Sequence, residues 1–157
     1  MDYFERIQNS IEYIEEHLQN ELLIKKVSSA SYFSAFHFQR LFHAITGFSV
    51  QQYIRNRRLS EAALLLETTS KNILEIAISF QYGSQEAFTR AFANYFGVTP
   101  SKYRKVKNTT PLQTKLNFLD YQIKGELTMN KPEIVYLKNS LLQEMYTKLL
   151  YRTKSIL

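Results

Sequence analysis

The sequence of 157 residues contains no cysteine and no tryptophan, and it has only four glycines and three prolines. Without cysteine, the chain can form neither a disulfide framework nor a thiolate metal site, and a cysteine nucleophile is excluded. Four glycines are too few for the glycine-rich loops that hold phosphates in Walker or dinucleotide sites. The first residues lack the apolar stretch of a signal peptide, and no apolar run is long enough for a membrane span. We therefore expect a cytoplasmic protein without a membrane partner.

The charge of the chain changes sign along its length. Residues 1–21 carry six acidic side chains and one basic one, whereas residues 22–107 carry twelve basic side chains and four acidic ones. The net charge is +6, and 45% of the residues are hydrophobic, which is enough for a buried core in one domain. A basic segment after an acidic start favours a polyanionic partner that meets one face. An ordinary solvated surface accounts for these charges equally well.

A repeat with an offset of 50 residues lies within the basic segment. Residues 34–47 align with residues 84–97, and five of the fourteen aligned positions are identical. Further identical or similar pairs at this offset are Tyr32 with Tyr82, Tyr53 with Tyr103, Leu23 with Ile73, and Val27 with Ala77. Two copies are too few for a solenoid, so the pattern indicates a duplicated supersecondary unit.

Each copy has the pattern of a helix-turn-helix unit. Ser34 and Ser84 stand at N-cap positions, and Gly47 and Gly97 stand where a helix ends in a left-handed residue. Between them, apolar residues recur at helical spacing: Phe38, Leu41, Phe42 and Ile45 in the first copy, and Phe88, Ala91, Phe92 and Tyr95 in the second. A shorter apolar segment precedes each stripe. We therefore predict two units in which a short helix and a tight turn precede a longer helix, at about 34–46 and 84–96.

Further helices are predicted around the two units. An apolar stripe predicts a first helix over residues 3–19. Ser49 and Gln52 have the spacing of a capping box, which opens a long helix over residues 49–67. Thr99 and Pro100 begin a short last helix. The fold class expected up to residue 107 is all-α, with seven helices arranged as a first unit at about 1–48, a linker helix at 49–67 and a second unit at 68–107.

The linker helix is long enough to hold two DNA-reading helices near the separation of successive major grooves. Nineteen residues at about 1.5 Å each give about 28 Å, near the ~34–36 Å between successive major grooves on one side of a duplex. Opposite their apolar stripes, the two longer helices present side chains that pair with base edges. The predicted base-contacting residues are Phe36, Gln39, Arg40 and His43 in the first helix and Gln85, Glu86, Thr89 and Arg90 in the second. The predicted phosphate contacts are Ser34, Arg55, Arg57, Lys71, Ser84 and Lys102.

Simpler roles exist for several of these residues. Arg40 and Arg90 can be solvated charges, and Phe36 can pack on a neighbouring helix. Glu86 can pair with Arg90 four residues later instead of contacting a base. The two N-cap serines serve as helix caps whether or not they face phosphates.

The sequence resembles the DNA-binding domain of AraC/XylS-type regulators. The run from Ser34 to Ala62 is similar to the first half of that domain, and the run from Ile76 to Arg104 is similar to the second half with its signature. The resemblance covers about residues 3–106 and implies a transcription regulator whose two helix-turn-helix units bind adjacent major grooves. It implies base reading by Phe36, Gln39, Arg40, Gln85, Glu86 and Arg90. Gln81 departs from the family, which usually has glycine in the second turn; a positive φ there costs a non-glycine residue about 1–2 kcal/mol.

Residues 108–157 are expected to form a C-terminal extension after a boundary at residues 108–111. Residues 116–123 and 132–137 alternate like strands, and residues 141–150 favour a short helix. Residues 129–136 resemble the opening strand of a gyrase-inhibitor-like effector domain, which senses small molecules in relatives. The chain ends about twenty residues later. We therefore expect a stub, a truncated product or an appendage packed on the helical domain, without a working effector pocket.

The function expected from the sequence is specific binding of double-stranded DNA at an asymmetric site by a monomer. RNA polymerase is the second expected partner. The alternative is a helical protein-interaction module without specific DNA affinity. An enzyme is not expected, because no nucleophile–base pair, carboxylate pair or metal set occurs at a usable spacing. Neither a cofactor nor a metal is predicted, since His37 and His43 lack further ligands nearby.

Overall fold

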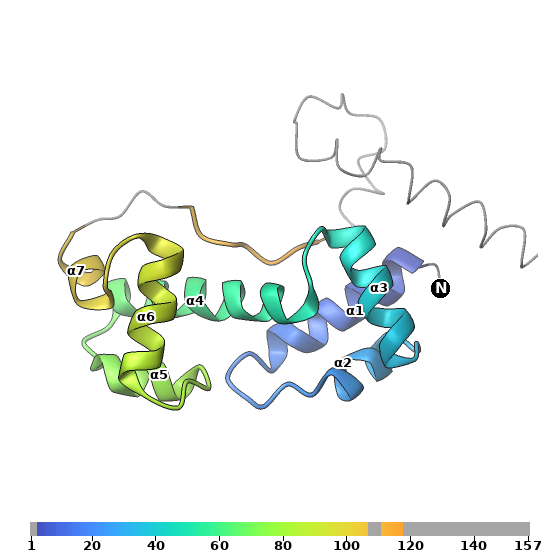
Figure 1. The fold of residues 1–157 in the computed structure, drawn as a ribbon, viewed down its shortest axis with the longest axis horizontal. Coiled ribbons are helices and arrows are strands. Elements are labelled where there is room, and N and C mark those ends of the chain that lie inside the picture. Colours follow the sequence, from blue (N-terminus) through green and yellow to red (C-terminus); the bar gives the residue numbers. More distant parts are fainter. Residues whose placement is uncertain (1–2, 107–110, 118–157) are drawn as a thin grey trace, which may run out of the picture.

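The computed structural model describes residues 3–106 and 111–117, and this part of the chain contains seven helices and no strand. The helices are α1 (Tyr3–Glu16), α2 (Ile24–Ala30), α3 (Ala35–Thr46), α4 (Val50–Thr68), α5 (Ile73–Ser79), α6 (Gln85–Phe96) and α7 (Pro100–Lys105). Figure 1 shows α1–α3 gathered at one end of α4 and α5–α7 at the other. The predicted all-α fold of two units joined by a long helix is confirmed. In this described part, no helix is long and apolar enough to cross a membrane.

The two longer helices of the repeat begin and end at the predicted residues. Ser34 accepts a hydrogen bond from the backbone N–H three residues later at 3.4 Å, and Ser84 does the same at 3.1 Å. Gly47 and Gly97 end these helices with φ angles of 77° and 74°. That left-handed conformation carries no steric cost for glycine, which explains the two residues in the sequence.

Side chains also cap α4, α5 and α7, the helices that flank α3 and α6. Asn72 and Glu75 form a reciprocal capping box at the start of α5. Ser49 accepts a hydrogen bond from an N–H three residues later at 3.2 Å, which is one half of the box predicted at the start of α4. Thr99 caps α7, and Pro100 follows at the first helical position. The local sequence therefore determines where these elements start.

Each turn of the two helix-turn-helix units contains a strained residue that is not glycine. Tyr32 has a φ of 57°, and Gln81 has a φ of 66°. The left-handed conformation costs such residues about 1–2 kcal/mol. Tertiary contacts hold both turns, since Arg6 of α1 donates to the backbone carbonyls of Ser31 and Tyr32, and Gln81 Nε2 donates to the carbonyl of Gln19 at 2.6 Å.

The second turn is one residue longer than the first. Helices α2 and α5 match at an offset of 49 residues, as do the strained residues Tyr32 and Gln81, whereas α3 and α6 match at an offset of 50. Tyr82 therefore corresponds to Phe33, and each of them packs against the core of its own unit. The single offset of 50 predicted for the whole repeat is wrong for its first helices, because the identity of Tyr32 and Tyr82 hides the extra residue.

The two units have separate hydrophobic cores. Residues 55–58 at the middle of α4 are all polar, and they divide the apolar face of this helix. Before them, α4 contributes Val50, Tyr53 and Ile54 to the first core, which α1, α2 and α3 complete. After them, it contributes Leu59, Ala62, Ala63 and Leu66 to the second core, which α5, α6 and α7 complete. The described part of the chain is therefore a pair of small domains that share one helix.

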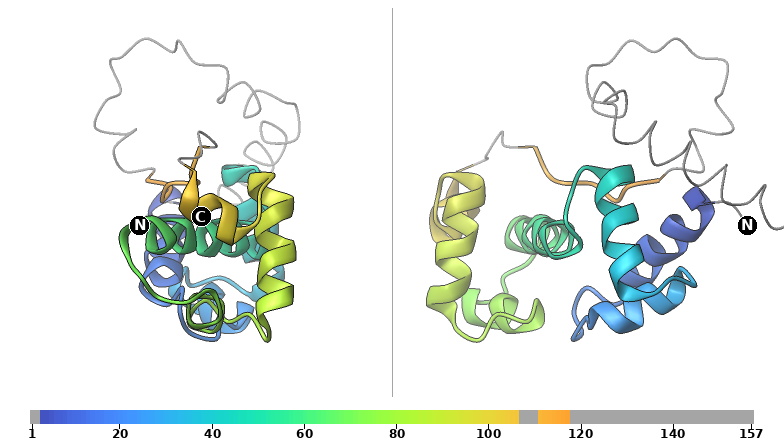
Figure 2. Two further views of the ribbon diagram at one scale, coloured as in Figure 1. Left: turned by 90° about the vertical axis from the view of Figure 1, so that its left-hand side faces the viewer. Right: turned by 45° about the vertical axis from the view of Figure 1, so that its right-hand side comes forward.

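Helices α3 and α6 run roughly parallel at opposite ends of α4 (Figure 1). Figure 2 shows in the view along α4 that both helices lie on the same side of it. The phenylalanines of their apolar stripes are buried in the two cores, so the opposite faces of α3 and α6 lie at the surface. Two helices on one side of a spacer can face successive major grooves on one side of a duplex.

The first described residues of the C-terminal extension pack on the helices. Residues 111–117 are extended and run beside α4 from the second unit towards the first (Figure 1). Of the predicted strand at 116–123, only residues 116 and 117 are described, and they belong to no strand. The strand predicted at 132–137 and the helix predicted at 141–150 lie outside the described residues.

Candidate nucleic-acid interface

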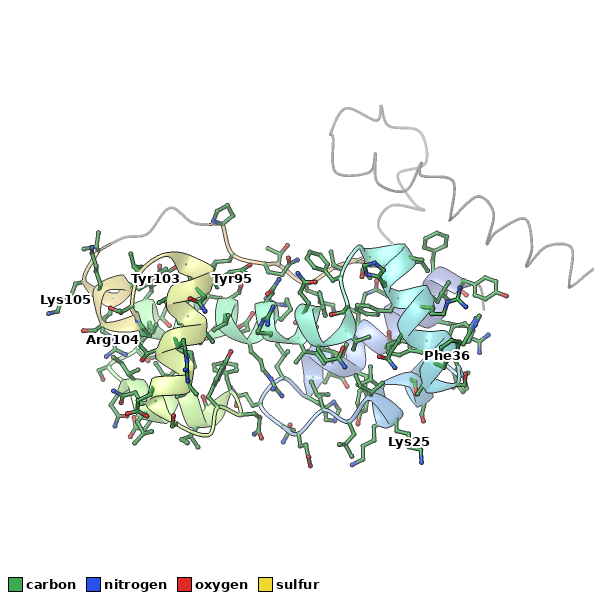
Figure 3. All side chains as sticks on the ribbon, viewed as in Figure 1. Lys25, Phe36, Tyr95, Tyr103, Arg104 and Lys105 are labelled. Atoms are coloured by element: carbon green, nitrogen blue, oxygen red, sulfur yellow. The ribbon has the colours of Figure 1, made fainter. Side chains whose placement is uncertain are left out.

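The outward face of α3 combines an aromatic ring with a guanidinium group. Phe36 is 72% exposed, and the Cζ atom of Arg40 lies 5.7 Å from the centre of its ring, within cation–π range. Figure 3 labels Phe36 on α3 and Lys25 on the neighbouring helix α2. Gln39 and His43 on the same helix are exposed. The structure therefore brings all four predicted base-contacting residues of α3 to the surface.

The outward face of α6 is polar and carries both signs of charge. Gln85, Glu86 and Arg90 are exposed, and Thr89 is half-buried. Hydrogen bonds from its own backbone N–H and from the Ser84 hydroxyl lower the pKa of Glu86. The carboxylate is therefore held at the N-terminus of α6, and the pairing with Arg90 considered from the sequence is not the contact that the structure shows.

A groove of about 440 Å³ lies between α4 and α6. The residues that line it are Arg55 and Leu59 from α4 and Ala87, Arg90, Ala91, Asn94 and Tyr95 from α6. Two guanidinium groups line this groove, and no acidic side chain does, so its electrostatic potential favours an anion. Arg55 therefore lies in the same groove as Arg90, a predicted base-contacting residue. A side chain that contacts the neighbouring phosphates is expected at such a position.

The other predicted phosphate contacts lie at helix ends. Ser34 is exposed and Ser84 half-exposed at the N-termini of α3 and α6. Helix N-termini favour phosphate through their backbone N–H groups, but at α6 the Glu86 carboxylate already accepts from one of them. Lys71 and Lys102 are exposed near the starts of α5 and α7. These positions agree with the predicted roles, which stay predictions.

Arg57 is a correction to the prediction. Its side chain is 8% exposed, and its guanidinium group forms ion pairs of 2.7 Å with Glu15 and with Glu61. The remaining Nη1 donates to the backbone carbonyl of Gln113 at 2.6 Å. Burial lowers the pKa of Arg57, but hydrogen bonds to Glu15 and Glu61 outweigh it and raise the pKa overall. Arg57 is therefore wrongly predicted as a phosphate contact, because its donors are already used inside the protein.

Two sets of residues that lie beside the predicted contacts were not among the candidates named from the sequence. Lys25 and Lys26 are exposed at the start of α2, beside the first reading helix, and their adjacency in a basic segment was the available signal. Asn94 and Tyr95 line the groove between α4 and α6, and no signal in the sequence places them there. In the described residues, no group of three His, Asp or Glu side chains is arranged to hold a metal ion.

These features define a class of protein: two helix-turn-helix units on one spacer, with both reading helices exposed on the same side. A family model described as a helix-turn-helix domain matches residues 27–106. The chain is 45% identical over 101 residues to the transposon Tn10 TetD protein of Escherichia coli, covering 64% of this chain and 73% of that protein. It is 40% identical over 113 residues to the multiple antibiotic resistance protein MarA of Escherichia coli K12, covering 72% of this chain and 86% of that protein. The chain belongs to the AraC/XylS-type helix-turn-helix family of DNA-binding transcription regulators.

A solved structure with a similar fold contains DNA. The DNA-binding domain of AdpA, a global transcriptional factor solved in complex with a target DNA, superposes with a TM-score of 0.60 at 26% identity and covers 64% of this chain and 90% of that chain. Another relative, the right origin-binding protein of Escherichia coli K12, is 34% identical over 140 residues. The match covers 89% of this chain but 47% of that protein, so the chain spans about half its length.

The gyrase-inhibitor-like resemblance predicted for residues 129–136 receives no support. The matching family model ends at residue 106. Residues 129–136 also lie outside the described part of the chain.

Proposed function

We propose that this protein binds one asymmetric DNA site as a monomer, with α3 and α6 in successive major grooves. The observation that carries the proposal is the difference between two exposed faces on the same side of α4. At an offset of 50 residues Arg40 matches Arg90, but Phe36 matches Glu86 and the glutamine of α3 matches Thr89. Because the faces differ, the two half-sites require different bases.

The side chains suggest how each half-site is read. Arg40 and Arg90 suit bidentate hydrogen bonds to guanine, and Gln39 and Gln85 suit adenine. Glu86 has a lowered pKa, so it stays ionised and able to accept a hydrogen bond from cytosine. Phe36, His43 and Thr89 complete the proposed base contacts, with the phenyl ring and the threonine methyl suited to thymine methyl groups.

The proposed phosphate contacts surround these helices. Arg55 lines the groove beside α6, and Lys71 and Lys102 are exposed near helix starts. The N-terminus of α3, with its cap Ser34, offers backbone N–H groups to the same strands. Ser84 is the proposed phosphate contact at the N-terminus of α6, where the Glu86 carboxylate already accepts from its own N–H.

The proposal extends to the setting of this activity. A transcription regulator acts by recruiting or blocking RNA polymerase, which is therefore the second proposed partner. The protein acts in the cytoplasm with its DNA. We assign it no catalytic activity, no cofactor and no small-molecule effector.

The test compares alanine and lysine substitutions of Arg40 and Arg90 on duplexes in which single base pairs are changed. Each alanine variant loses about 1–3 kcal/mol of discrimination at one base position, and each position falls in a different half-site. Arg40→Lys and Arg90→Lys keep the charge but lose the bidentate fork, so they also relax specificity. If the lysine variants read all positions as well as the wild type, these arginines contact phosphates and the base-reading roles fail.

A salt titration of the wild type tests the class of function. Specific DNA binding weakens steeply with salt because phosphate contacts release counterions. Equal, weak affinity for all duplexes at every salt concentration would indicate a protein-interaction module instead.

A further inference from the structure

The middle of α4, between the two units, is polar. Their hydrophobic cores do not merge, and the four residues of α4 between the cores are polar. Arg57 and Asn56 are nevertheless buried there. Long helices curve gently rather than staying straight, and since no apolar contact joins the two cores across residues 55–58, contacts beside α4 bear on how one unit lies against the other.

Residues 111–117, here called the strap, join the two cores. Leu112 packs against the second core, and Leu116 packs against the first. The strap runs antiparallel to α4, since Gln113 N–H donates to Ser60 Oγ at 2.9 Å and Leu116 N–H donates to the Tyr53 hydroxyl at 3.3 Å. Three extended residues span about 10 Å, which matches about 10 Å for seven helical residues.

The strap is also tied to α1. Gln8 Nε2 donates to the carbonyl of Leu116 at 3.3 Å, and Lys115 forms an ion pair with Glu12. Burial raises the pKa of Glu12, but hydrogen bonds from Lys115 and Gln8 outweigh this effect and lower the pKa overall. The segment therefore contacts α1, α4 and both cores within a few residues.

Arg57 connects the strap to the buried network of the first unit. Its guanidinium group binds Glu15 of α1, Glu61 of α4 and the carbonyl of Gln113. Tyr53 donates to the same Glu15 carboxylate at 2.9 Å while accepting from the strap. Burial and the charge of Glu15 raise the pKa of Tyr53 above its ordinary value, which keeps this hydroxyl protonated as a donor.

A second set of contacts holds the loop between α1 and α2. Arg58 donates to the carbonyls of Leu18 at 2.8 Å and Asn20 at 2.7 Å. Gln81, from the turn of the second unit, donates to the carbonyl of Gln19 between them. The adjacent residues Arg57 and Arg58 therefore anchor two different segments to the polar middle of α4.

We propose that the strap and its junction at Arg57 fix the relative orientation of the two units and so set the half-site spacing that the protein accepts. The spacing part rests on the proposed function, whereas the mechanical part does not. An added base pair moves one half-site by ~3.4 Å and rotates it by about a tenth of a turn. A rigid pair of reading helices cannot follow this displacement.

The mechanical part is tested by electron–electron distance measurements on the full-length chain. The sequence has no cysteine, so Glu16→Cys and Ile78→Cys place one spin label on each unit, at exposed positions of α1 and α5. With the intact strap, the distribution of distances between the two labels is narrow. In the double variant Leu112→Ser/Leu116→Ser, the distribution is at least twice as wide. Thr114→Ala, which changes an exposed side chain of the strap, leaves the width unchanged. If the double variant does not fold, Ser60→Ala/Lys115→Ala removes two polar contacts of the strap without changing either core.

The spacing part is tested with unlabelled protein on operators that differ by one inserted base pair. The wild type loses about tenfold in affinity on insertion, comparable to the cost of one mismatched base pair. The strap variants lose less than about threefold, while their preference for each half-site sequence stays the same. The proposal is overturned if the strap variants have the same width of the label-distance distribution as the wild type and the same loss of affinity when a base pair is inserted. A wild type without any sequence preference overturns the proposed function instead, and the label distances still decide the mechanical part.

Discussion

Arg55 and Arg57 lie two residues apart on α4. Truncating Arg57 to alanine is expected to lower the stability of the fold, whereas truncating Arg55 is expected to weaken DNA binding. Arg57 is buried and paired, whereas Arg55 is exposed and lines the groove beside α6. We therefore expect Arg57 to matter for folding and Arg55 to matter for DNA affinity.

The magnitude for Arg57→Ala follows from what the truncation leaves behind. Three hydrogen bonds of 2.7–3.1 Å join the guanidinium group to Glu15, whose side chain is 13% exposed. Without Arg57, the Glu15 carboxylate still accepts a hydrogen bond from the Tyr53 hydroxyl, but it no longer has a positive charge beside it. Breaking a buried ion pair by removing one partner costs about 3–5 kcal/mol. That is a large part of the ~5–15 kcal/mol that stabilises a typical domain.

For Arg55→Ala the expected change in stability is below about 0.5 kcal/mol, as for other surface substitutions. The expected change in DNA binding is larger. Losing one phosphate contact lowers the magnitude of the slope of log K against log salt concentration by about 0.9.

The assay is urea unfolding of both variants, followed by salt titration of DNA binding for each variant that remains folded. Arg57→Lys is the control, because it keeps the charge without the planar fork and recovers part of the stability. The reasoning is refuted if Arg57→Ala unfolds at the wild-type urea concentration and loses a phosphate contact in the salt slope. That result would restore Arg57 to the surface role predicted from the sequence.

Two further predictions concern single contacts. Because the pKa of Glu12 is lowered in the folded state, the stability that its pair with Lys115 provides is present above the unfolded pKa and is lost as pH falls through the lower folded pKa. Carboxyl NMR titration should therefore give Glu12 a pKa below 4.5 that rises in Lys115→Ala; an unchanged pKa contradicts the contact. Ser84→Ala removes the N-cap of α6 and should cost about 1 kcal/mol in urea unfolding, whereas Ser101→Ala, an exposed change inside α7, should cost less than about 0.5 kcal/mol; equal costs contradict the capping role.

Local chemistry made most of the fold predictable. Ser34 and Ser84 cap helices, and Gly47 and Gly97 end them, through contacts within four residues along the chain. Each apolar stripe indicated which face of its helix is buried and therefore which face is free. The exposed residues of α3 and α6 were found in this way.

The remaining errors depend on contacts between distant residues. Arg57 and Glu61 look like an exposed pair on one helix, but Arg57 also binds Glu15, 42 positions earlier, and Gln113, 56 positions later, and these distant contacts have no signal in the sequence. The position of the strap was not predicted, since it depends on contacts of Leu112 and Leu116 with two separate cores. The extra residue in the second turn escaped because Tyr32 and Tyr82 are identical, although the backbone places Gln81 at the equivalent position.

Selection of bound duplexes from a random pool tests the central claim most directly. A chain that reads DNA with both α3 and α6 enriches two different short motifs, separated by about one helical turn of 10–10.5 base pairs. Changing Arg40 alters only one of these motifs, and changing Arg90 alters only the other. Enrichment of a single motif, or of none, would contradict reading by two helices.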